Sequence, residues 1–209
     1  MEKISAYKNQ ALASLKGNWG DCVIITLIYC AIKLIFASSL GILGSIFTRH
    51  YFSVATLLIL PLDWGYLIFF LNLARKANVG KNTLFDGFMS NQYVRLLGTI
   101  LLYSILVLVG LIILIIPGII LMLMFSQFYF VMKDNPELKY MDALKMSAKL
   151  MKGHLWQFFL LNLSFIGWGL LAMLTFGIGW LWLAPYIYTT CAHYYEDLKS
   201  EYEAQVQND

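Results

Sequence analysis

The feature that most constrains this chain is a stretch from Leu96 to Met132 that carries no charged side chain. As a single helix its 37 residues would extend about 55 Å, whereas the hydrocarbon core of a bilayer is about 30 Å thick. The stretch is therefore long enough to cross a membrane twice. Pro117-Gly118 lies near its middle, as either a kink in one long helix or a turn between two helices.

Apolar blocks of this kind recur along the chain and predict an all-α membrane protein. The chain is 60% hydrophobic and 13% charged, whereas soluble domains average about 25% charged residues. Three more blocks cover 22–47, 51–74 and 155–195, and the first two contain one charge each, Lys33 and Asp63. At about 20 residues per span, the four blocks hold six helices. We expect one membrane domain over 1–209, with spans at about 21–46, 53–74, 96–116, 117–133, 155–175 and 178–196.

The basic residues decide between kink and turn. Thirteen of the fifteen Lys and Arg residues lie in four segments outside the apolar blocks. The positive-inside rule requires all four segments to be cytoplasmic, which holds only if the last two blocks each reverse direction. This predicts three helical hairpins with cytoplasmic N and C termini. The external turns fall at Thr48–His50, at 115–118 and at Thr175–Gly179, although the second could begin as early as Gly110.

The three hairpins share sequence features that suggest an internal repeat. Each returning helix contains one proline, which we expect at a bend or turn together with Gly118. These prolines are Pro61, Pro117 and Pro185. A Lys-Gly pair also opens the first and the last hairpin. Because proline is common in membrane helices, a chance similarity in spacing is the alternative.

Two amphipathic helices are expected on the cytoplasmic side, over about 2–16 and 136–152. Asn135 suits a helix cap, and Pro136 suits the first helical position. The second helix has a basic face, which either lies on anionic lipid at the inner interface or is exposed while the helix packs on the ends of the bundle. The residues proposed to face lipid or a partner are Lys139, Lys145, Lys149, Lys152 and His154.

Lys33 and Asp63 are ionisable residues inside predicted spans. Lys33 lies 12 residues after Asp21, and Asp63 lies 12 residues before Arg75, so both sit roughly 18 Å from the cytoplasmic edge. A charge at this depth needs a partner, and we expect the two side chains to pair. The pair is either a structural lock between the two helices or part of a substrate or proton site.

No enzyme signature is present, and we expect neither catalysis nor a cofactor. The chain has no GxSxG, HExxH or Walker motif, and its three histidines are predicted at different membrane edges. We therefore predict no metal site. The three cysteines have no CxxC spacing and are interpreted as small apolar residues. Nothing in the charge pattern indicates binding to nucleic acid.

Five stretches carry a family resemblance: PLDWGYLIFFLNLAR (61–75), LIIPGII (114–120), DNPELKYMDALKMSAKLMKGH (134–154), LNLSFIGWGLLAMLTFGIGWLWLAPY (161–186) and YYEDL (194–198). Together they resemble a bacterial family of integral membrane proteins catalogued as domain of unknown function nine-seventy-five. The resemblance covers the chain from Leu15 to Leu198 and implies a location in the bacterial inner membrane. The family is distantly similar to the non-catalytic membrane domain found beside some glycerophosphodiester phosphodiesterases.

Two functional hypotheses follow. The first is a non-enzymatic inner-membrane protein that organises lipid, including anionic lipid, or a protein partner through its basic cytoplasmic face. The second is a small transporter or exporter component with a mid-membrane site near Lys33 and Asp63. A water-accessible cavity lined by this pair and Asn162 would favour transport, and a tightly packed centre would count against it.

Overall fold

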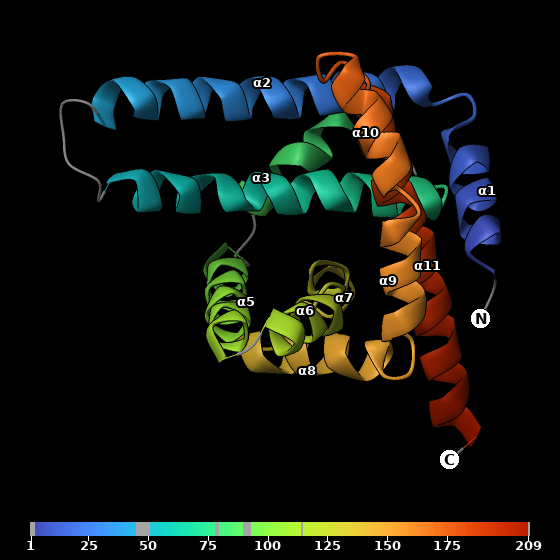
Figure 1. Ribbon diagram of the computed structural model, residues 1–209. Helices are drawn as coiled ribbons and strands as arrows, with labels where there is room; N and C mark the ends of the chain where they lie inside the picture. Colours follow the sequence, from blue (N-terminus) through green and yellow to red (C-terminus); the bar gives the residue numbers. More distant parts are fainter. Residues whose placement is uncertain (1–2, 45–50, 78–79, 90–92, 114, 209) are drawn as a thin grey trace.

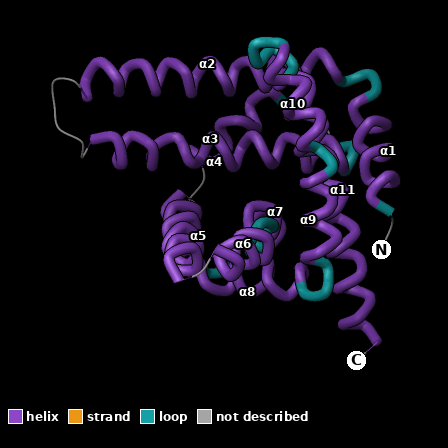
Figure 2. Tube along the Cα trace, viewed as in Figure 1, coloured by secondary structure: helices purple, strands orange, loops and turns teal. Residues whose placement is uncertain are grey.

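The computed structural model describes residues 3–44, 51–77, 80–89, 93–113 and 115–208, and over these residues it contains helices and turns but no strand (Figures 1 and 2). The elements are α1 (Ile4–Leu15), α2 (Trp19–Gly44), α3 (Tyr51–Ala74), the 3-10 helix η1 (Lys81–Phe85), α4 (Asp86–Met89), α5 (Tyr93–Ile113), α6 (Ile115–Met124), α7 (Phe128–Asp134), α8 (Tyr140–Met151), α9 (Leu155–Leu163), α10 (Ile166–Leu174) and α11 (Trp180–Asn208). The loop expected at Thr48–His50 lies outside the described residues.

The predicted spans correspond to α2, α3, α5, α6 with α7, α9 with α10, and α11. Most of their ends lie within about three residues of the predicted ends, whereas α11 continues to Asn208. Two spans that we expected to be continuous are broken. The hydroxyls of Ser126 and Ser164 donate to the carbonyls of Leu123 and Leu161, three residues earlier, at 2.8 and 2.6 Å. Such bonds compete with the helical backbone pattern and accompany each break.

Length and hydropathy identify three candidate membrane spans among the described residues: Tyr93–Ile112, Ile116–Asp134 and Leu155–Leu174. A fourth arises if Ile4–Leu15 and Trp19–Ile35, which meet at an angle of 95°, are counted as one broken span. The protein is therefore an all-helical chain with three or four candidate spans, and the complete set of six stays a prediction.

The long charge-free stretch changes direction between α5 and α6. The helix α5 ends at Ile113 and α6 begins at Ile115, so Pro117 is the third residue of α6 and lies in its first turn. The two helices touch at two glycines. A Cβ added to Gly118 would lie 2.5 Å from the Leu111 side chain, and one added to Gly110 would lie 3.1 Å from the Gly118 Cα. The reversal thus lies just before the predicted 115–118, inside the wider range that begins at Gly110.

The three helix pairs run in different directions instead of forming one parallel bundle. In Figure 1, α2 and α3 lie side by side across the view, α9, α10 and α11 run down it, and α5 and α6 are seen closer to end-on. The groove lined by Trp19, Trp168, Thr175, Gly179 and Trp182 reflects this crossing. It brings the start of α2 beside the turn between α10 and α11, although the predicted topology puts these segments on opposite sides of the membrane.

Short helices connect the pairs in one recurring order. The helix α1, which precedes the α2/α3 pair, packs on α11; η1 and α4, which precede α5/α6, pack on α3; and α8, which precedes α9/α11, packs on α5 and α7. Gly65 and Gly87 permit the second of these contacts, because a Cβ at either position would approach the backbone of Leu84 or Pro61 to within 2.5 Å or less. The short helices before the second and third pairs therefore pack on the pair that precedes them, and α1 packs on α11 of the last pair.

The turns from α1 into α2 and from α8 into α9 have the same backbone geometry. In Leu15–Asn18 and Met151–His154, the lysines have φ/ψ of −60°/119° and −63°/120°, and the glycines that follow have φ of +89° and +88°. The last N–H of each turn donates to the first carbonyl, at 2.9 and 3.0 Å. These are type II turns, and their third position requires a positive φ, which favours glycine.

The helix expected over 136–152 begins later, at Tyr140. Asn135 ends α7 instead of capping α8, because its side-chain amide donates to the Val131 carbonyl at 3.0 Å. The Leu138 N–H then donates to the Asn135 carbonyl at 3.2 Å, which closes a turn before α8 starts. The predicted helix start at Asn135-Pro136 is therefore wrong. An asparagine side chain can hydrogen-bond at the beginning of one helix or at the end of the helix before it, and here it bonds to the end of α7.

Candidate functional site

Lys33 on α2 and Asp63 on α3 form an ion pair. The Lys33 Nζ lies 2.7 Å from the Asp63 Oδ1, and the side chains are 41% and 26% exposed. The Tyr29 hydroxyl donates to the same carboxylate oxygen at 2.6 Å, and the Lys33 ammonium lies 4.7 Å from the centre of the Tyr29 ring. One carboxylate oxygen thus serves two donors, an arrangement that holds the two helices in register.

An aromatic group continues from this pair toward the core. Tyr29 stacks on the buried Tyr66 with ring centres 4.2 Å apart, and the Tyr66 hydroxyl is 2.9 Å from the Thr26 hydroxyl. Tyr188 of α11 contacts the edge of Tyr66, with ring centres 5.2 Å apart. The inner side of the pair is therefore packed with aromatic rings that link α2 and α3 to α11.

A second charged group lies where the returning helices of the three pairs meet. Arg75 follows α3 and donates to both Asp134 oxygens at 2.8 and 2.6 Å, and its Nε donates to Glu196 at 2.8 Å. Lys199 and the Tyr195 hydroxyl reach Asp134 at 2.7 and 3.0 Å. We name Arg75, Asp134, Tyr195, Glu196 and Lys199 the charged cluster.

Burial makes the charged cluster a strong electrostatic contact. The Asp134 side chain is 9% exposed and that of Arg75 is 27% exposed. Burial acts to lower the pKa of the Arg75 guanidinium, but its hydrogen bonds to Asp134 and Glu196 outweigh this and raise the pKa. The guanidinium therefore stays charged and joins the ends of α3 and α7 to the middle of α11.

The basic residues predicted to face lipid lie on and beside α8. Lys139 precedes α8, and Lys145, Lys149 and Lys152 are exposed. His154 is partly buried, with its Nε2 3.5 Å from the Glu201 carboxylate, and its carbonyl accepts a bond from the Tyr194 hydroxyl. The lysines thus share an exposed surface, which we name the α8 basic face, whereas His154 belongs to the contact between the α8–α9 turn and α11.

The apolar faces of both predicted amphipathic helices are buried in protein. Leu144, Leu150 and Met151 of α8 are at most 4% exposed, and Tyr7 and Leu15 of α1 are fully buried. This is the packing alternative considered above for these helices. Hydrophobic residues remain exposed on α8 at Tyr140 and Met141, at 43% and 45%.

The three prolines occupy different places in their helices. Pro61 and Pro185 are buried inside α3 and α11, whereas Pro117 lies in the first turn of α6 beside the tightly packed Gly118. Pro61 removes one backbone hydrogen bond from α3, at the point where α4 packs closely on it. None of the three carries a reactive group, so their role is in helix geometry.

Sequence reasoning predicted the Lys33–Asp63 pair but missed the charged cluster. It placed Arg75 at the cytoplasmic end of a predicted span, but it did not bring Arg75 together with Asp134 and Glu196. The signal was that a charge follows each returning helix at a similar point. Among the described residues, no three His, Cys, Asp or Glu side chains are grouped so that they could hold a metal ion.

The helices and the apolar candidate spans of the described residues are compatible with a helical membrane protein whose helix pairs are joined by charged contacts. Residues 98–202, about half of the chain, match the model of a family described as a protein of unknown function (DUF975), and the chain belongs to that family. No curated protein and no solved structure matches the chain. The distant similarity to the phosphodiesterase membrane domain therefore stays a prediction.

Proposed function

We propose that this protein is a non-enzymatic component of the bacterial inner membrane that gathers anionic lipid at its cytoplasmic side through the α8 basic face. The observation that carries the proposal is the arrangement of α8. Its apolar side is used in packing, and Lys145, Lys149 and Lys152 remain exposed together. A lysine near an anionic membrane surface contributes about 1 kcal/mol of attraction.

The proposal includes a topology of six spans in three hairpins with both termini in the cytoplasm. Its support is the distribution of basic residues and the recurrence of one unit, in which a short helix precedes a helix pair and packs on the pair before it. The identical type II turns at Leu15–Asn18 and Met151–His154 support a common origin of the first and last units. The groove at Trp19, which brings the start of α2 beside the α10–α11 turn, is an observation against this topology.

The lipid hypothesis is tested by reconstituting the protein into vesicles and measuring quenching of tryptophan fluorescence by brominated lipids. Trp156 is 69% exposed and follows Lys152 closely, so a variant in which the other five tryptophans are replaced by phenylalanine reports on lipid beside α8. We expect brominated phosphatidylglycerol to quench more strongly than brominated phosphatidylcholine. The Lys145→Gln, Lys149→Gln, Lys152→Gln variant should lose most of this preference.

The matched control replaces the same three lysines by arginine, which keeps the charge and should keep the preference for phosphatidylglycerol. Equal quenching by the two lipids in the wild-type protein would contradict lipid binding. A partner protein would then be the remaining use of the α8 basic face.

The Lys33–Asp63 pair favours a structural role over the transport hypothesis. The carboxylate is already bonded to Lys33 and Tyr29, and Asn162 donates to the Phe158 carbonyl of its own helix at 2.8 Å. A transport site needs polar groups that exchange partners with a substrate. Substrate-dependent currents in proteoliposomes that Asp63→Asn abolishes would instead make the pair part of a pathway.

A further inference from the structure

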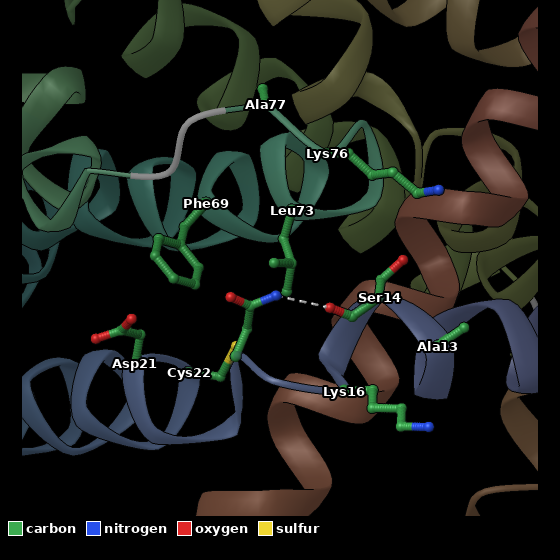
Figure 3. A pocket seen from close by; sticks show the side chains of 10 residues that line it. Ala13, Ser14, Lys16, Asp21, Cys22, Phe69, Leu73, Lys76 and Ala77 are labelled. Carbon is green, nitrogen blue, oxygen red and sulfur yellow. Dashed lines mark hydrogen bonds between the residues drawn. The ribbon is translucent and has the colours of Figure 1, made fainter.

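A polar cavity of about 510 Å³ lies between the α1–α2 turn and the end of α3. Figure 3 shows Lys76 and Lys16 on either side of Ser14, with their side chains extending outward from the cavity, whereas Asp21 lies on the opposite side and Phe69 is part of the wall. The cavity is within the range of small-molecule sites, which is about 300–1,000 Å³. Its lining includes no residue of the α8 basic face or of the Lys33–Asp63 pair, and Lys76 directly follows Arg75 of the charged cluster.

The two lysines come from separate elements, and the backbone fixes where their exposed side chains begin, from which each can turn toward the cavity. Lys16 occupies the second position of its type II turn. Lys76 has a φ of +54°, a left-handed conformation, and its N–H donates to the Leu73 carbonyl at 3.0 Å. The next residue, Ala77, donates to the Asn72 carbonyl at 2.9 Å, so α3 ends in a motif whose left-handed position is usually glycine. The chain places a cation there instead.

Both ammonium groups are open to a ligand. Lys16 and Lys76 are exposed, and over the described part of the chain neither forms an ion pair. Inside the cavity, the Asn18 side chain donates to the Ser14 carbonyl at 3.1 Å and is held in place (Figure 3). The Asp21 carboxylate repels anions, but it lies on the side away from the lysines.

The equivalent place in the last helix pair has the opposite charge. There the turn Met151–His154 faces the end of α11, and His154 lies 3.5 Å from the Glu201 carboxylate. In the first pair the turn faces Lys76 at the end of α3, so a cation stands where the last pair has an acid. The last pair thus supplies its own anionic partner, whereas the first leaves two cations at the mouth of a cavity.

We propose that this cavity binds a phosphate group between Lys16 and Lys76, carried either by a phospholipid headgroup or by a water-soluble phosphate ester. Lysine is a common phosphate ligand, and the Phe69 wall accommodates the apolar part of the molecule that carries the phosphate. The site is independent of the proposed function on α8, because it uses different residues.

The test measures binding of dioctanoyl phosphatidylglycerol and of glycerol 3-phosphate to the detergent-purified full chain by titration calorimetry. We expect the Lys16→Gln, Lys76→Gln variant to bind about tenfold or more weakly than the wild type, since bonds to charged groups contribute about 1.5–3 kcal/mol each. The control Lys3→Gln, which removes an exposed lysine outside both the cavity and the α8 basic face, should bind as the wild type does, and Lys16→Arg, Lys76→Arg should retain most of the affinity.

Binding of the lipid alone would support the site and identify a phospholipid, and comparable binding of both probes would support it and identify a soluble phosphate ester. Unchanged affinity in the Lys16→Gln, Lys76→Gln variant would overturn the proposal, and so would an equal loss in the Lys3→Gln control. Thermal unfolding of each ligand-free variant shows whether it is folded. If the double variant does not fold, Lys16→Gln and Lys76→Gln singly should each weaken binding about tenfold, and no change in either would overturn the site.

Discussion

At the residue scale, the two charged groups differ in burial and therefore in what they contribute. Asp134 is 9% exposed and has partners on α3 and α11, whereas the Lys33 and Asp63 side chains are 41% and 26% exposed. Removing one member of a buried pair leaves the other charged and without its partner, which costs far more than loss of an exposed pair. The charged cluster should therefore dominate the stability of the fold.

We expect Asp134→Asn to lower the free energy of unfolding by about 3 kcal/mol, because Arg75 and Lys199 would keep their charges without the carboxylate. Unfolding in mixed detergent micelles, followed by circular dichroism, measures the change. Asp142→Asn, at an exposed position in the first turn of α8, is the matched control and should cost less than about 1 kcal/mol. Similar losses in both variants would show that the charged cluster is not specially stabilising.

A double-mutant cycle tests the coupling between Lys33 and Asp63. Lys33→Met and Asp63→Leu each leave one charge without its 2.7 Å partner, and the double variant removes both charges. We expect the double variant to be more stable than the sum of the single losses predicts, by about 1 kcal/mol. Additive losses in the same unfolding assay would mean that the two side chains do not interact in the folded protein.

At the element scale, the recurring type II turns set the angle at which each short helix meets the pair that follows. The glycines at 17 and 153 have φ of +89° and +88°, and an added Cβ would meet no atom within 4 Å at either position. A substitution there changes the backbone conformation and makes no steric clash. The two turns can therefore be compared directly.

Gly17→Ala and Gly153→Ala should each destabilise the protein by about 1–2 kcal/mol, the cost of a left-handed conformation for a residue with a Cβ. Gly20→Ala provides the control, because Gly20 lies in α2 without a positive φ and also has open space around its Cβ. That variant should be neutral or slightly stabilising. A Gly17→Ala variant as stable as the wild type would show that the first turn does not require a positive φ.

The sequence predicted where the helices begin and end better than where they are broken. Charges at Arg75, Lys133 and Arg95 locate helix ends because a charge is expensive inside a bilayer, and most predicted ends agree closely with the structure. The breaks at Ser126 and Ser164 were missed because a serine in an apolar helix can equally bond its own helix without breaking it. The charged cluster was missed because charges beyond a span are usually solvated.

At the scale of the whole molecule, the arrangement of the pairs could not be predicted from the sequence. Hydropathy and charge give the number and direction of spans but contain no information about tilt. The structure shows how the pairs are connected: α4 and α8 each pack on the helix pair that precedes them, and α1 packs on α11 of the last pair. The ends of α3 and α7 and the middle of α11 meet at the charged cluster, so this group of side chains lies where all three pairs join.

The proposed function requires the α8 basic face to lie in the cytoplasm and the α10–α11 turn to lie on the other side of the membrane. Phe176 in that turn is fully exposed, and Lys149 is exposed on α8. Single cysteines at these two positions, in a variant whose three native cysteines are replaced by serine, can be labelled with a membrane-impermeant maleimide.

This labelling is the most direct test of the account. In intact cells whose outer membrane has been permeabilised, Phe176→Cys should react and Lys149→Cys should not, whereas inverted inner-membrane vesicles should give the reverse. Reaction of both positions from the same side would contradict the three-hairpin topology, and reaction of Lys149→Cys from outside would remove the basic face from the cytoplasmic lipid that it is proposed to bind.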